Sequence, residues 1–407
     1  MSVLVVGAGV SGRGFAQFLK SQGHTPLIYD DKTNKFSIKN LEKFDAIYFS
    51  PGINIRHPLW QMSLASNITI LNDLDSFFVW KSHAKIIGIT GTAGKTTICC
   101  MISHILTVCK VEHHLCGNMG IDIFKDSPIY IIELSSLVLS RTQKFACDIG
   151  IIVNLDVDHL DVHKCKEKYI SAKLDILRPY LAKKQKFYVD SKYDSMVSNY
   201  LEIVTTPLPP NILGEHNRHN ARLALSIGRE LGLQEKEMYD ALGTFNMANY
   251  SFGQFRQTEY ILSPTLTFVN DSISTRVAAL RAAMERYDNI TLIVGGILKF
   301  ITPTNTLNAA DVAFILNNLK HVLPKVRKVY IFGSHAARFE QIFKQVKDCT
   351  VFQDMEELIA HLHETVKEGV ILFSPMGSSF DFYTSASDRG RHVEFLVNKY
   401  WFNSHVS

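Results

Sequence analysis

The stretch Gly88-Ile-Thr-Gly91-Thr-Ala-Gly94-Lys95-Thr96-Thr97 decides how the middle of this chain folds. Apolar residues flank it at 85–90 and 98–108, which predicts a strand, a loop and a helix in that order. Backbone N–H groups of such a loop hold phosphates, the lysine reaches the β and γ oxygens, and the following threonine hydroxyl faces Mg²⁺. The general pattern wants a further glycine where Ile89 stands, so the match is imperfect. We favour a nucleoside triphosphate site over a chance turn.

A second glycine loop, Gly7-Ala-Gly9-Val-Ser11-Gly12, follows the apolar segment that begins at Val3. Asp30 and Asp31 come about twenty residues later, as in the dinucleotide-binding fingerprint. Glycines admit phosphates closely, and a helix N-terminus stabilises their charge. On local grounds NAD or FAD, another nucleotide whose ribose or base the acids hold, and a tight turn without a ligand all remain open.

Alternation of strand and helix patterns divides the chain into three blocks and predicts an α/β protein with parallel sheets. The blocks are a Rossmann-like domain at 1–82, a central P-loop ATPase-type domain at 83–250 and a Rossmann-like domain at 251–407. We expect strands at 3–7, 25–29, 46–50, 68–71, 85–90, 129–133, 149–154, 266–270, 290–294, 328–332 and 370–373. We expect helices at 13–22, 98–108, about 217–243, 275–287, 308–322, 335–346, 355–367 and 389–400.

The composition excludes several classes of protein. The 407 residues are 46% hydrophobic and 20% charged, with a net charge of +4, and the basic residues are dispersed, so no nucleic-acid partner is expected. No apolar run is long enough for a transmembrane helix, and the start of the chain has no cationic leader. Seven cysteines without C-x-x-C spacing indicate reduced thiols in the cytoplasm and no structural zinc site.

Glu133 ends the predicted strand at 129–133, which places its carboxylate at the carboxyl edge of the central sheet. The P-loop opens at that same edge, so Glu133 is a candidate Mg²⁺ ligand. A surface acid at a strand end is the alternative.

Three acids and two histidines follow the strand at 149–154, in the segment Asn154-Leu-Asp156-Val-Asp158-His159-Leu-Asp161-Val-His163. His159 and His163 are spaced to bind zinc from one helical face. A solvated loop is the plain alternative. Because a P-loop demands a hard cation, we favour one histidine that completes a Mg²⁺ site.

Three further polar residues, Lys173, Asn217 and Asn220, are ambiguous from their local sequence. Lys173 on its own reads as a solvated helix lysine. Asn217 and Asn220 lie one helical turn apart and can present amides to an adenine or ribose, although Asn217 could equally cap its helix.

Taken in order, the motifs resemble those of the Mur ligases of bacterial peptidoglycan synthesis, most of all the members that add D-glutamate to UDP-N-acetylmuramoyl-L-alanine. The resemblance spans nearly the whole chain, and its strength lies in the order and spacing of motifs that are weak singly. They are Gly91–Thr97, Gly117-Asn118-Met-Gly120, Glu133-Leu-Ser-Ser136, Asp158-His159-Leu-Asp161, Ala172-Lys173-Leu174, His216-Asn217-x-x-Asn220-Ala221, Asn270-Asp271-Ser272, Ser374-Pro-x-x-x-Ser379-x-Asp381 and Arg389-Gly390.

The resemblance implies roles for individual residues in a cytoplasmic, monomeric enzyme that uses ATP and two Mg²⁺ ions. Catalytic roles fall to Lys95, Glu133, His159 and Lys173, with Thr96, Glu133, His159 and a carbamylated Lys173 holding the metals. ATP would be bound by Gly91, Thr92, Gly94, Lys95, Thr96, Thr97, Asn217, Asn220, Arg256 and Asp271. The UDP-linked substrate would contact Gly9, Ser11, Asp30, Asp31, Asn118 and Ser135, and the amino acid would contact Ser379 and Phe380.

The chain also departs from the family pattern. Ala93 replaces a usual Asn or His in the P-loop, and Val138 stands where Gln is frequent. Ile273, Ile297 and Ala386 replace a lysine, an acid and an aromatic residue toward the C-terminus, so specificity for the acceptor amino acid is open. A related ligase that adds L-alanine, an NAD-dependent oxidoreductase and a nucleotide-binding protein without turnover are the alternatives.

Overall fold

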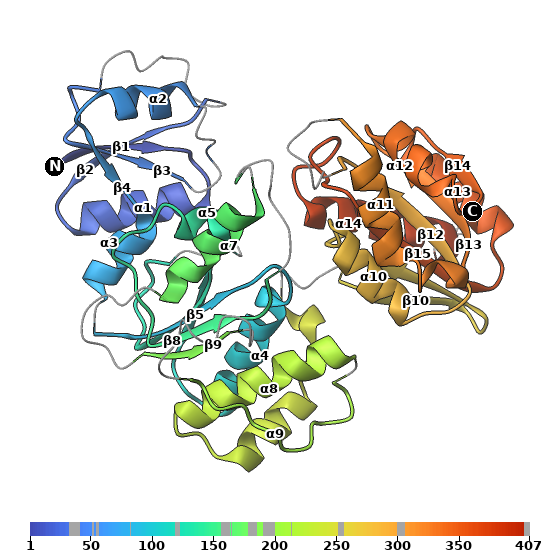
Figure 1. Cartoon of the computed structure of the whole chain (residues 1–407), viewed down its shortest axis with the longest axis horizontal. Helices are drawn as coiled ribbons and strands as arrows, with labels where there is room; N and C mark the ends of the chain where they lie inside the picture. The colour runs from blue at the N-terminus through green and yellow to red at the C-terminus, as the bar shows by residue number, and fades with distance from the viewer. Residues whose placement is uncertain are drawn as a thin grey trace. The chain divides into compact units, whose positions relative to one another are not determined.

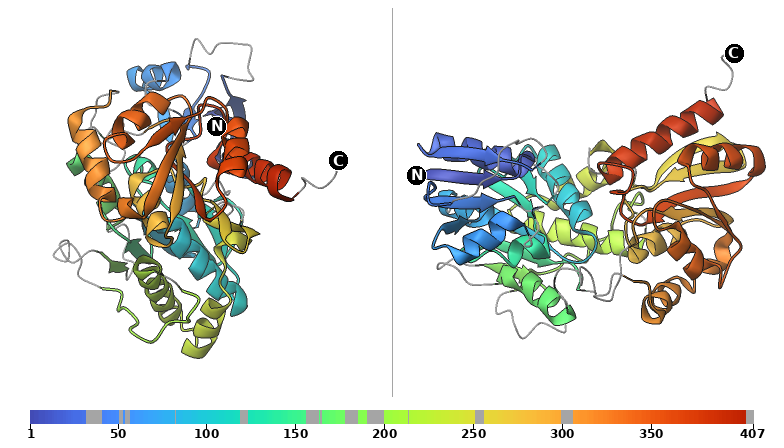
Figure 2. Two further views of the ribbon diagram at one scale, coloured as in Figure 1. Left: turned by 90° about the vertical axis from the view of Figure 1, so that its right-hand side faces the viewer. Right: turned by 90° about the horizontal axis from the view of Figure 1, so that it is seen from above.

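The computed structural model describes residues 1–31, 41–50, 53, 57–81, 83–118, 123–155, 163, 165–177, 185–189, 200–212, 214–250, 256–298 and 306–402 (Figure 1). These residues form two compact units. The first contains residues up to 157 together with 166–245, and the second is built mainly from residues after 246. Figure 2 shows the ribbon from two further sides. None of the described helices has the length and apolarity needed to cross a membrane.

The first sheet is parallel, with the strand order β2-β1-β3-β4 among the described residues. Its core follows the two-residue period of a strand, because side chains alternate between the faces. Val3 and Val5 pack with Phe15 of helix α1, whereas Leu4 and Val6 pack with Leu59 of helix α2. The elements are β1 (Ser2–Val6), α1 (Val10–Ser21), β2 (Thr25–Tyr29), β3 (Ala46–Phe49), α2 (Pro58–Ala65), β4 (Thr69–Leu71) and α3 (Asp73–Trp80).

The second sheet is also parallel, with the described order β6-β7-β5-β8-β9. One face packs against α4, α8 and α9, as Figure 1 shows. The other face packs against Phe77 and Phe78 of α3, which joins the first two sheets into one unit. The elements are β5 (Lys85–Thr90), α4 (Lys95–Val108), β6 (His114–Gly117), β7 (Ile129–Glu133), α5 (Ser136–Leu139), β8 (Ile149–Ile152), α7 (Lys166–Leu174), η1 (Asp175–Leu177), β9 (Lys186–Tyr188), α8 (Glu215–Glu230), α9 (Glu235–Gly243) and η3 (Met247–Asn249).

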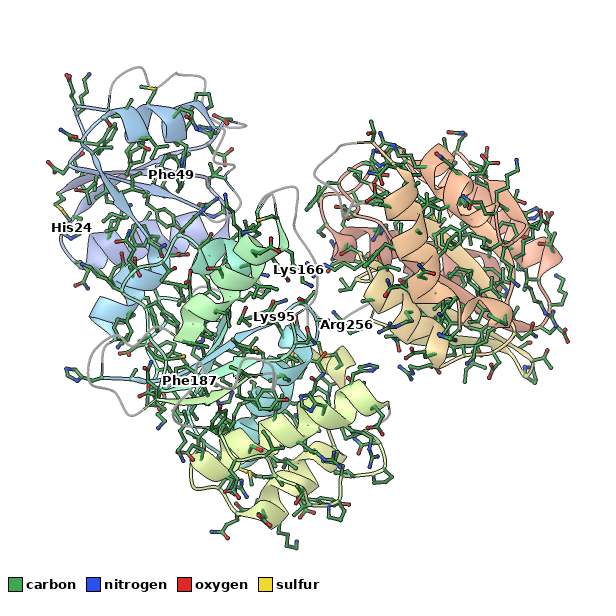
Figure 3. All side chains as sticks on the ribbon, in the orientation of Figure 1. His24, Phe49, Lys95, Lys166, Phe187 and Arg256 are labelled. Atoms are coloured by element: carbon green, nitrogen blue, oxygen red, sulfur yellow. The ribbon has the colours of Figure 1, made fainter. Side chains whose placement is uncertain are left out.

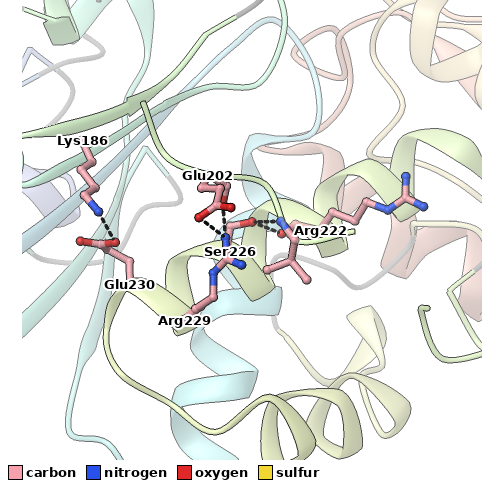
Figure 4. Close-up of polar contacts among 7 residues, drawn as sticks. Lys186, Glu202, Arg222, Ser226, Arg229 and Glu230 are labelled. Atoms are coloured by element: carbon pink, nitrogen blue, oxygen red, sulfur yellow. Dashed lines mark hydrogen bonds and ion pairs between the residues drawn. The ribbon is translucent and has the colours of Figure 1, made fainter. Parts of the chain in front are cut away.

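Polar contacts fix α8 against the edge of this sheet (Figure 4). Lys186 of β9 pairs with Glu230 at 2.7 Å, and Arg229 donates to the backbone carbonyl of Glu202 at 2.8 Å. The Ser226 hydroxyl accepts the backbone N–H of Val204 at 2.8 Å. These bonds hold the helix that carries Asn217 and Asn220.

The third sheet forms the second unit, with the described order β10-β11-β15-β12-β13-β14. Only β10 runs antiparallel to its neighbour among the described strands. Helices α10, α11 and α12 cover one face, and α13 and α14 cover the other. The elements are β10 (Thr258–Ser263), β11 (Leu266–Asn270), α10 (Val277–Glu285), β12 (Ile290–Gly295), α11 (Ala309–Leu319), η4 (Leu323–Lys325), β13 (Val326–Phe332), α12 (Ala336–Phe343), β14 (Cys349–Val351), α13 (Met355–Thr365), β15 (Gly369–Met376), α14 (Ala386–Val397) and η5 (Asn398–Phe402).

The α/β class with parallel sheets is confirmed, and the differences from the sequence predictions are local. The helical region near 217–243 is two helices, because the chain turns between them at Gly232, where φ is 81°. Helix α8 begins at Glu215 with Gly214 as its N-cap, so the suggestion that Asn217 caps the helix is wrong. The sequence interpretation gave no bounds for α2, α3, α5, α7, β6, β9, β10 and β14, all of nine residues or fewer.

Candidate functional site

The loop between β5 and α4 has the backbone conformation of a phosphate-binding loop. Gly91 and Gly94 both have positive φ, at 148° and 83°. A Cβ on Gly91 would lie 3.0 Å from Val153 Cβ, and one on Gly94 would lie 3.2 Å from Asn220 Oδ1. Both positions therefore need glycine for conformation and for space. Gly94 is also the N-cap of the 14-residue α4, so the positive end of that helix dipole faces the loop.

Lys95, which is labelled in Figure 3, begins α4, and its hydrogen bond to Gly91 shows that the side chain folds back over this loop. Its Nζ donates to the carbonyl oxygen of Gly91 at 2.9 Å and to that of Thr92 at 3.4 Å. The ammonium group is therefore held at the loop, where it can exchange backbone oxygens for phosphate oxygens. Thr97 lies in the same first turn of the helix.

Thr96 and Glu133 meet at the carboxyl edge of the central sheet. Strands β5 and β7 are adjacent, with Ile89 opposite Glu133, so the strand end places this carboxylate beside the start of α4. The Thr96 hydroxyl donates to Glu133 Oε2 at 2.7 Å, and Asn118 Nδ2 is 3.4 Å from Glu133 Oε1. Glu133 is only 5% exposed. A hydroxyl, a carboxylate and an amide are the oxygen donors that Mg²⁺ prefers, so this donor set fits the ion.

Lys173 is buried, with 2% of its surface exposed, so the interpretation as a solvated helix lysine is wrong. Tyr169, Ala172 and Lys173 share the buried face of α7 at helical spacing. Lys173 Nζ donates to the Gly91 carbonyl at 2.7 Å and lies 4.8 Å from the centre of the Tyr169 ring. The structure thus places a second lysine nitrogen against the P-loop.

Two further residues hold the P-loop in place, and the sequence interpretation assigned them no role. Asn154 Oδ1 accepts the backbone N–H groups of Thr92 at 3.0 Å and Ala93 at 2.9 Å. The Tyr169 hydroxyl lies 2.9 Å from the Thr92 hydroxyl oxygen. The available signal for Asn154 was its position just after an apolar strand, at the edge where Glu133 also lies.

The other residues predicted for this site differ in their positions and contacts. Asn220 is 3% exposed beside Gly94, and Asn217 lies one turn earlier on α8. The Ser135 hydroxyl accepts the backbone N–H of Val138 at 3.2 Å, so it caps α5. His159 lies outside the described residues. Within the described part of the chain no group of three His, Cys, Asp or Glu side chains gathers as a metal site.

The first glycine loop is equally constrained but is charged differently. Gly7 has a φ of 101°, and a Cβ on Gly12 would lie 1.8 Å from the Gly7 carbonyl oxygen. Asp30 Oδ2 accepts the Ala8 backbone N–H at 2.9 Å. The structure thus gathers Gly9, Ser11 and Asp30 where β1 leads into α1, whereas the Asp31 carboxylate lies 2.9 Å from His57 Nε2.

In the second unit, Asp271 is buried where β11 ends. It accepts a hydrogen bond from the Ser374 hydroxyl at 2.8 Å. Burial raises the pKa of Asp271 to about 7, while the positive charge of Arg256 opposes that rise. Arg256 Nε is buried and has no hydrogen-bond partner in the described structure. The structure therefore brings these two predicted nucleotide-binding residues together.

The predicted amino-acid contacts differ in exposure. Ser379 is 2% exposed and Phe380 is 72% exposed. Beside them, the buried Arg389 donates from Nη2 to the Ser272 carbonyl at 2.8 Å and from Nη1 to the Gly377 carbonyl at 3.1 Å. Burial lowers the pKa of Arg389 to about 10. Arg389 therefore joins the ends of β11 and β15 and stays charged at neutral pH.

Comparisons with known proteins find similarity to Mur ligases over nearly the whole chain. The family described as "Mur ligase middle domain" matches residues 89–207, which include the P-loop, Glu133 and Lys173. A UDP-N-acetylmuramoylalanine–D-glutamate ligase of Lawsonia intracellularis is 29% identical over 434 residues, covering 98% of this chain and 94% of that protein. The ligase of that name from Rickettsia prowazekii is 25% identical over 454 residues and covers 98% of both chains.

Solved structures show the same fold. A MurF ligase from Thermotoga maritima, determined in complex with ADP, superposes with a TM-score of 0.61 at 14% identity. The match covers 98% of this chain and 94% of that one. At this sequence identity the structural similarity shows the fold alone.

Proposed function

We propose that this chain, which is similar to Mur ligases over nearly its whole length, joins D-glutamate to UDP-N-acetylmuramoyl-L-alanine at the expense of ATP. The reaction belongs to the synthesis of peptidoglycan precursors. The relatives named for this activity match the chain from end to end and support the assignment.

The arrangement of Lys95, Thr96 and Glu133 at one sheet edge is the observation that carries the proposal. It combines a cation for phosphate oxygens with oxygen donors for Mg²⁺, and Lys173 lies against the same loop. An NAD-dependent oxidoreductase has no use for such a centre, so we set that alternative aside.

The chemical problem is that a carboxylate resists attack by an amine, because the leaving group would be oxide. Transfer of the γ-phosphoryl group of ATP to the substrate carboxylate gives an acyl phosphate, whose phosphate leaves readily. Lys95 would neutralise charge on the transferring group, and the loop N–H groups at the start of α4 would orient it. The amine of D-glutamate then attacks the acyl carbon, and the tetrahedral intermediate expels phosphate.

Thr96, Glu133 and a carbamylated Lys173 would hold two Mg²⁺ ions, with His159 as a further ligand. Bound Mg²⁺ offsets the negative charge of the phosphates. Carbamylation requires the neutral amine of Lys173 to react with CO₂, which turns a cation into an anion. The burial of Lys173 against the P-loop supports this assignment, because it places the side-chain nitrogen beside the proposed metal site.

We further propose the remaining assignments for this enzyme. Residues 1–82 bind the UDP-linked substrate through Gly9, Ser11, Asp30 and Asp31, with Asn118 and Ser135 next to its muramoyl part. Residues 83–250 bind ATP. Within residues 251–407, Arg256 and Asp271 contact a nucleotide, and Ser379 and Phe380 contact the amino acid. We propose that the enzyme is a monomer located in the cytoplasm, a reducing compartment that suits seven cysteines without a disulfide.

Phosphate release in a matrix of substrates tests this function. We expect release from ATP only when both UDP-N-acetylmuramoyl-L-alanine and D-glutamate are present. Replacing these two substrates by UDP-N-acetylmuramate and L-alanine distinguishes the proposed activity from that of the related ligase that adds L-alanine. Release that needs neither acceptor nor amino acid, or no release under any combination, would overturn the proposal.

A further inference from the structure

The short helix α5 leads from the metal-binding edge of the central sheet toward the first sheet. It is capped by Ser135, two residues after Glu133, and Arg141 follows its end. Arg141 lies in the same compact unit as the first glycine loop. Its side chain is half-buried and had no role in the sequence interpretation.

The Arg141 guanidinium reaches elements of the first sheet. Its carbon lies 4.8 Å from the centre of the Trp60 ring on α2, and Nη2 is 3.5 Å from the carbonyl oxygen of Ile53. The side chain of Ile53 is in turn next to Gly7, since a Cβ there would lie 3.4 Å from Ile53 Cδ1. One residue, Ile53, thus separates Arg141 from the first glycine loop.

The backbone that carries Arg141 is fixed by the start of α3. Asn72 Nδ2 donates to the Arg141 carbonyl at 2.8 Å. The Asp75 carboxylate accepts the backbone N–H groups of Gln143, Lys144 and Phe145, the shortest at 2.8 Å. This segment is therefore held in place independently of the Arg141 side chain.

The guanidinium has five donors, yet in the described structure it makes a single side-chain hydrogen bond, at the long limit of 3.5 Å. Burial lowers the pKa of Arg141, and the negative charge of Asp73 only partly opposes this. A bound anion would supply the missing acceptors and would repay the cost of burying the cation.

The first glycine loop needs such a cation more than the P-loop does. It contains no lysine or arginine between Gly7 and Gly12, and the carboxylate of Asp30 already accepts one of its N–H groups. The next cation along the chain, Arg13, is exposed on α1. Within the part of the chain that the structure describes, a diphosphate at the start of α1 would therefore meet the negative charge of Asp30 without a neighbouring Lys or Arg, unless Arg141 supplies it.

We infer that Arg141 binds the diphosphate of the nucleotide-linked substrate, reaching from the central domain to the first glycine loop. The inference rests on the proposed function, which places a UDP-linked substrate at that loop. A planar guanidinium suits the site because it donates two parallel hydrogen bonds to phosphate oxygens. To reach them it exchanges its weak bond to Ile53, while Trp60 continues to support its flat face.

Isothermal titration of the full chain with UDP and with uridine tests the assignment. For Arg141→Ala we expect the affinity for UDP to fall about 10- to 100-fold, as for the loss of charge-assisted hydrogen bonds. The affinity for uridine, which has no phosphate, should change less than about twofold. Arg141→Lys, which keeps the charge without the planar fork, should recover part of the loss. Lys81→Ala is the matched control, because Lys81 also lies over a tryptophan ring, Trp80, in this unit.

The outcomes separate a binding role from a structural one. Equal losses for UDP and uridine in Arg141→Ala would indicate a purely structural contact and overturn the inference, as would unchanged binding of UDP. Thermal unfolding of Arg141→Ala and Arg141→Lys shows whether each variant folds, and the lysine variant tests the assignment if the alanine variant does not. A wild-type chain that binds neither UDP nor uridine would overturn both this inference and the proposed role of the first loop.

Discussion

Two glycine loops in one unit of this molecule have the same local form and different sources of charge. Each links a parallel strand to a helix and contains two glycines whose Cβ would lie within 3.2 Å of another residue: Gly7 and Gly12 in the first loop, Gly91 and Gly94 in the second. The loop after β5 carries its own cation in Lys95 and meets the carboxylate of Glu133 across the sheet edge. The loop after β1 has an acid, Asp30, on its N–H group. A glycine loop thus provides space and N–H donors, whereas the residues around it decide which phosphate chemistry is possible.

Loss of the P-loop cation should produce the largest effect. Lys95→Ala removes the charge that is proposed to neutralise the transferring phosphoryl group, so we expect phosphate release to fall about 1,000-fold. Binding of UDP should be unchanged, because the first loop does not contain this residue. A variant with parallel losses of turnover and UDP binding would mean that the two loops are not separate sites.

Replacing Lys173, the second lysine at the P-loop, distinguishes an ammonium group from a carbamate at this position. Lys173→Ala should lower turnover about 100-fold or more, because the proposed anionic metal ligand is lost. Acetate should restore part of the rate by supplying a carboxylate, and chloride at equal ionic strength serves as its control. Full activity without added acid would exclude a role for this residue in turnover.

The same two loops show how much of the candidate site could be predicted from the sequence. The strand–loop–helix units, Thr96 and Glu133 were predictable, because their arrangement depends on neighbouring residues and on strands that end at one edge. Asn154 and Tyr169 were not assigned, since each contacts a loop that is distant in sequence. Arg141 was not assigned either, since the residues that it contacts, Ile53 and Trp60, are equally distant. Short elements such as α3 carry too few residues for a clear period, although α3 joins the two sheets.

A steric change in the first loop should have an intermediate effect. Gly12→Ala would place a Cβ 1.8 Å from the Gly7 carbonyl oxygen, which forces α1 away from β1. We expect UDP binding to weaken about 10-fold and stability to fall by about 1–3 kcal/mol, as in overpacked cores. Gly243→Ala is the control, because a Cβ on this residue of α9 meets nothing within 4 Å and the residue lies outside both glycine loops. Equal behaviour of the two variants in titration and thermal unfolding would contradict the described loop geometry.

The smallest expected effect concerns the second unit and appears as pH dependence. Burial raises the pKa of Asp271 to about 7 from an ordinary 3.8, so between these values the folded chain binds more protons than the unfolded chain. The stability contribution of this group is therefore lost as pH rises toward 7. Asp271→Asn cannot ionise, so its stability relative to wild type should increase across this range, by at most about 1.4 kcal/mol for each pKa unit. Chemical denaturation at pH 5, 6, 7 and 8 measures the difference, and parallel curves would contradict the raised pKa.

The central claim is that residues at the P-loop edge of the central sheet activate the carboxylate of the substrate that binds at the first glycine loop. Turnover of UDP-N-acetylmuramoyl-L-alanine labelled with ¹⁸O in its carboxylate, in the presence of ATP and D-glutamate, tests this directly. An acyl phosphate predicts that each phosphate released carries one labelled oxygen, with ADP as the other nucleotide product. Unlabelled phosphate accompanying amide formation, or release of AMP and pyrophosphate, would contradict the account.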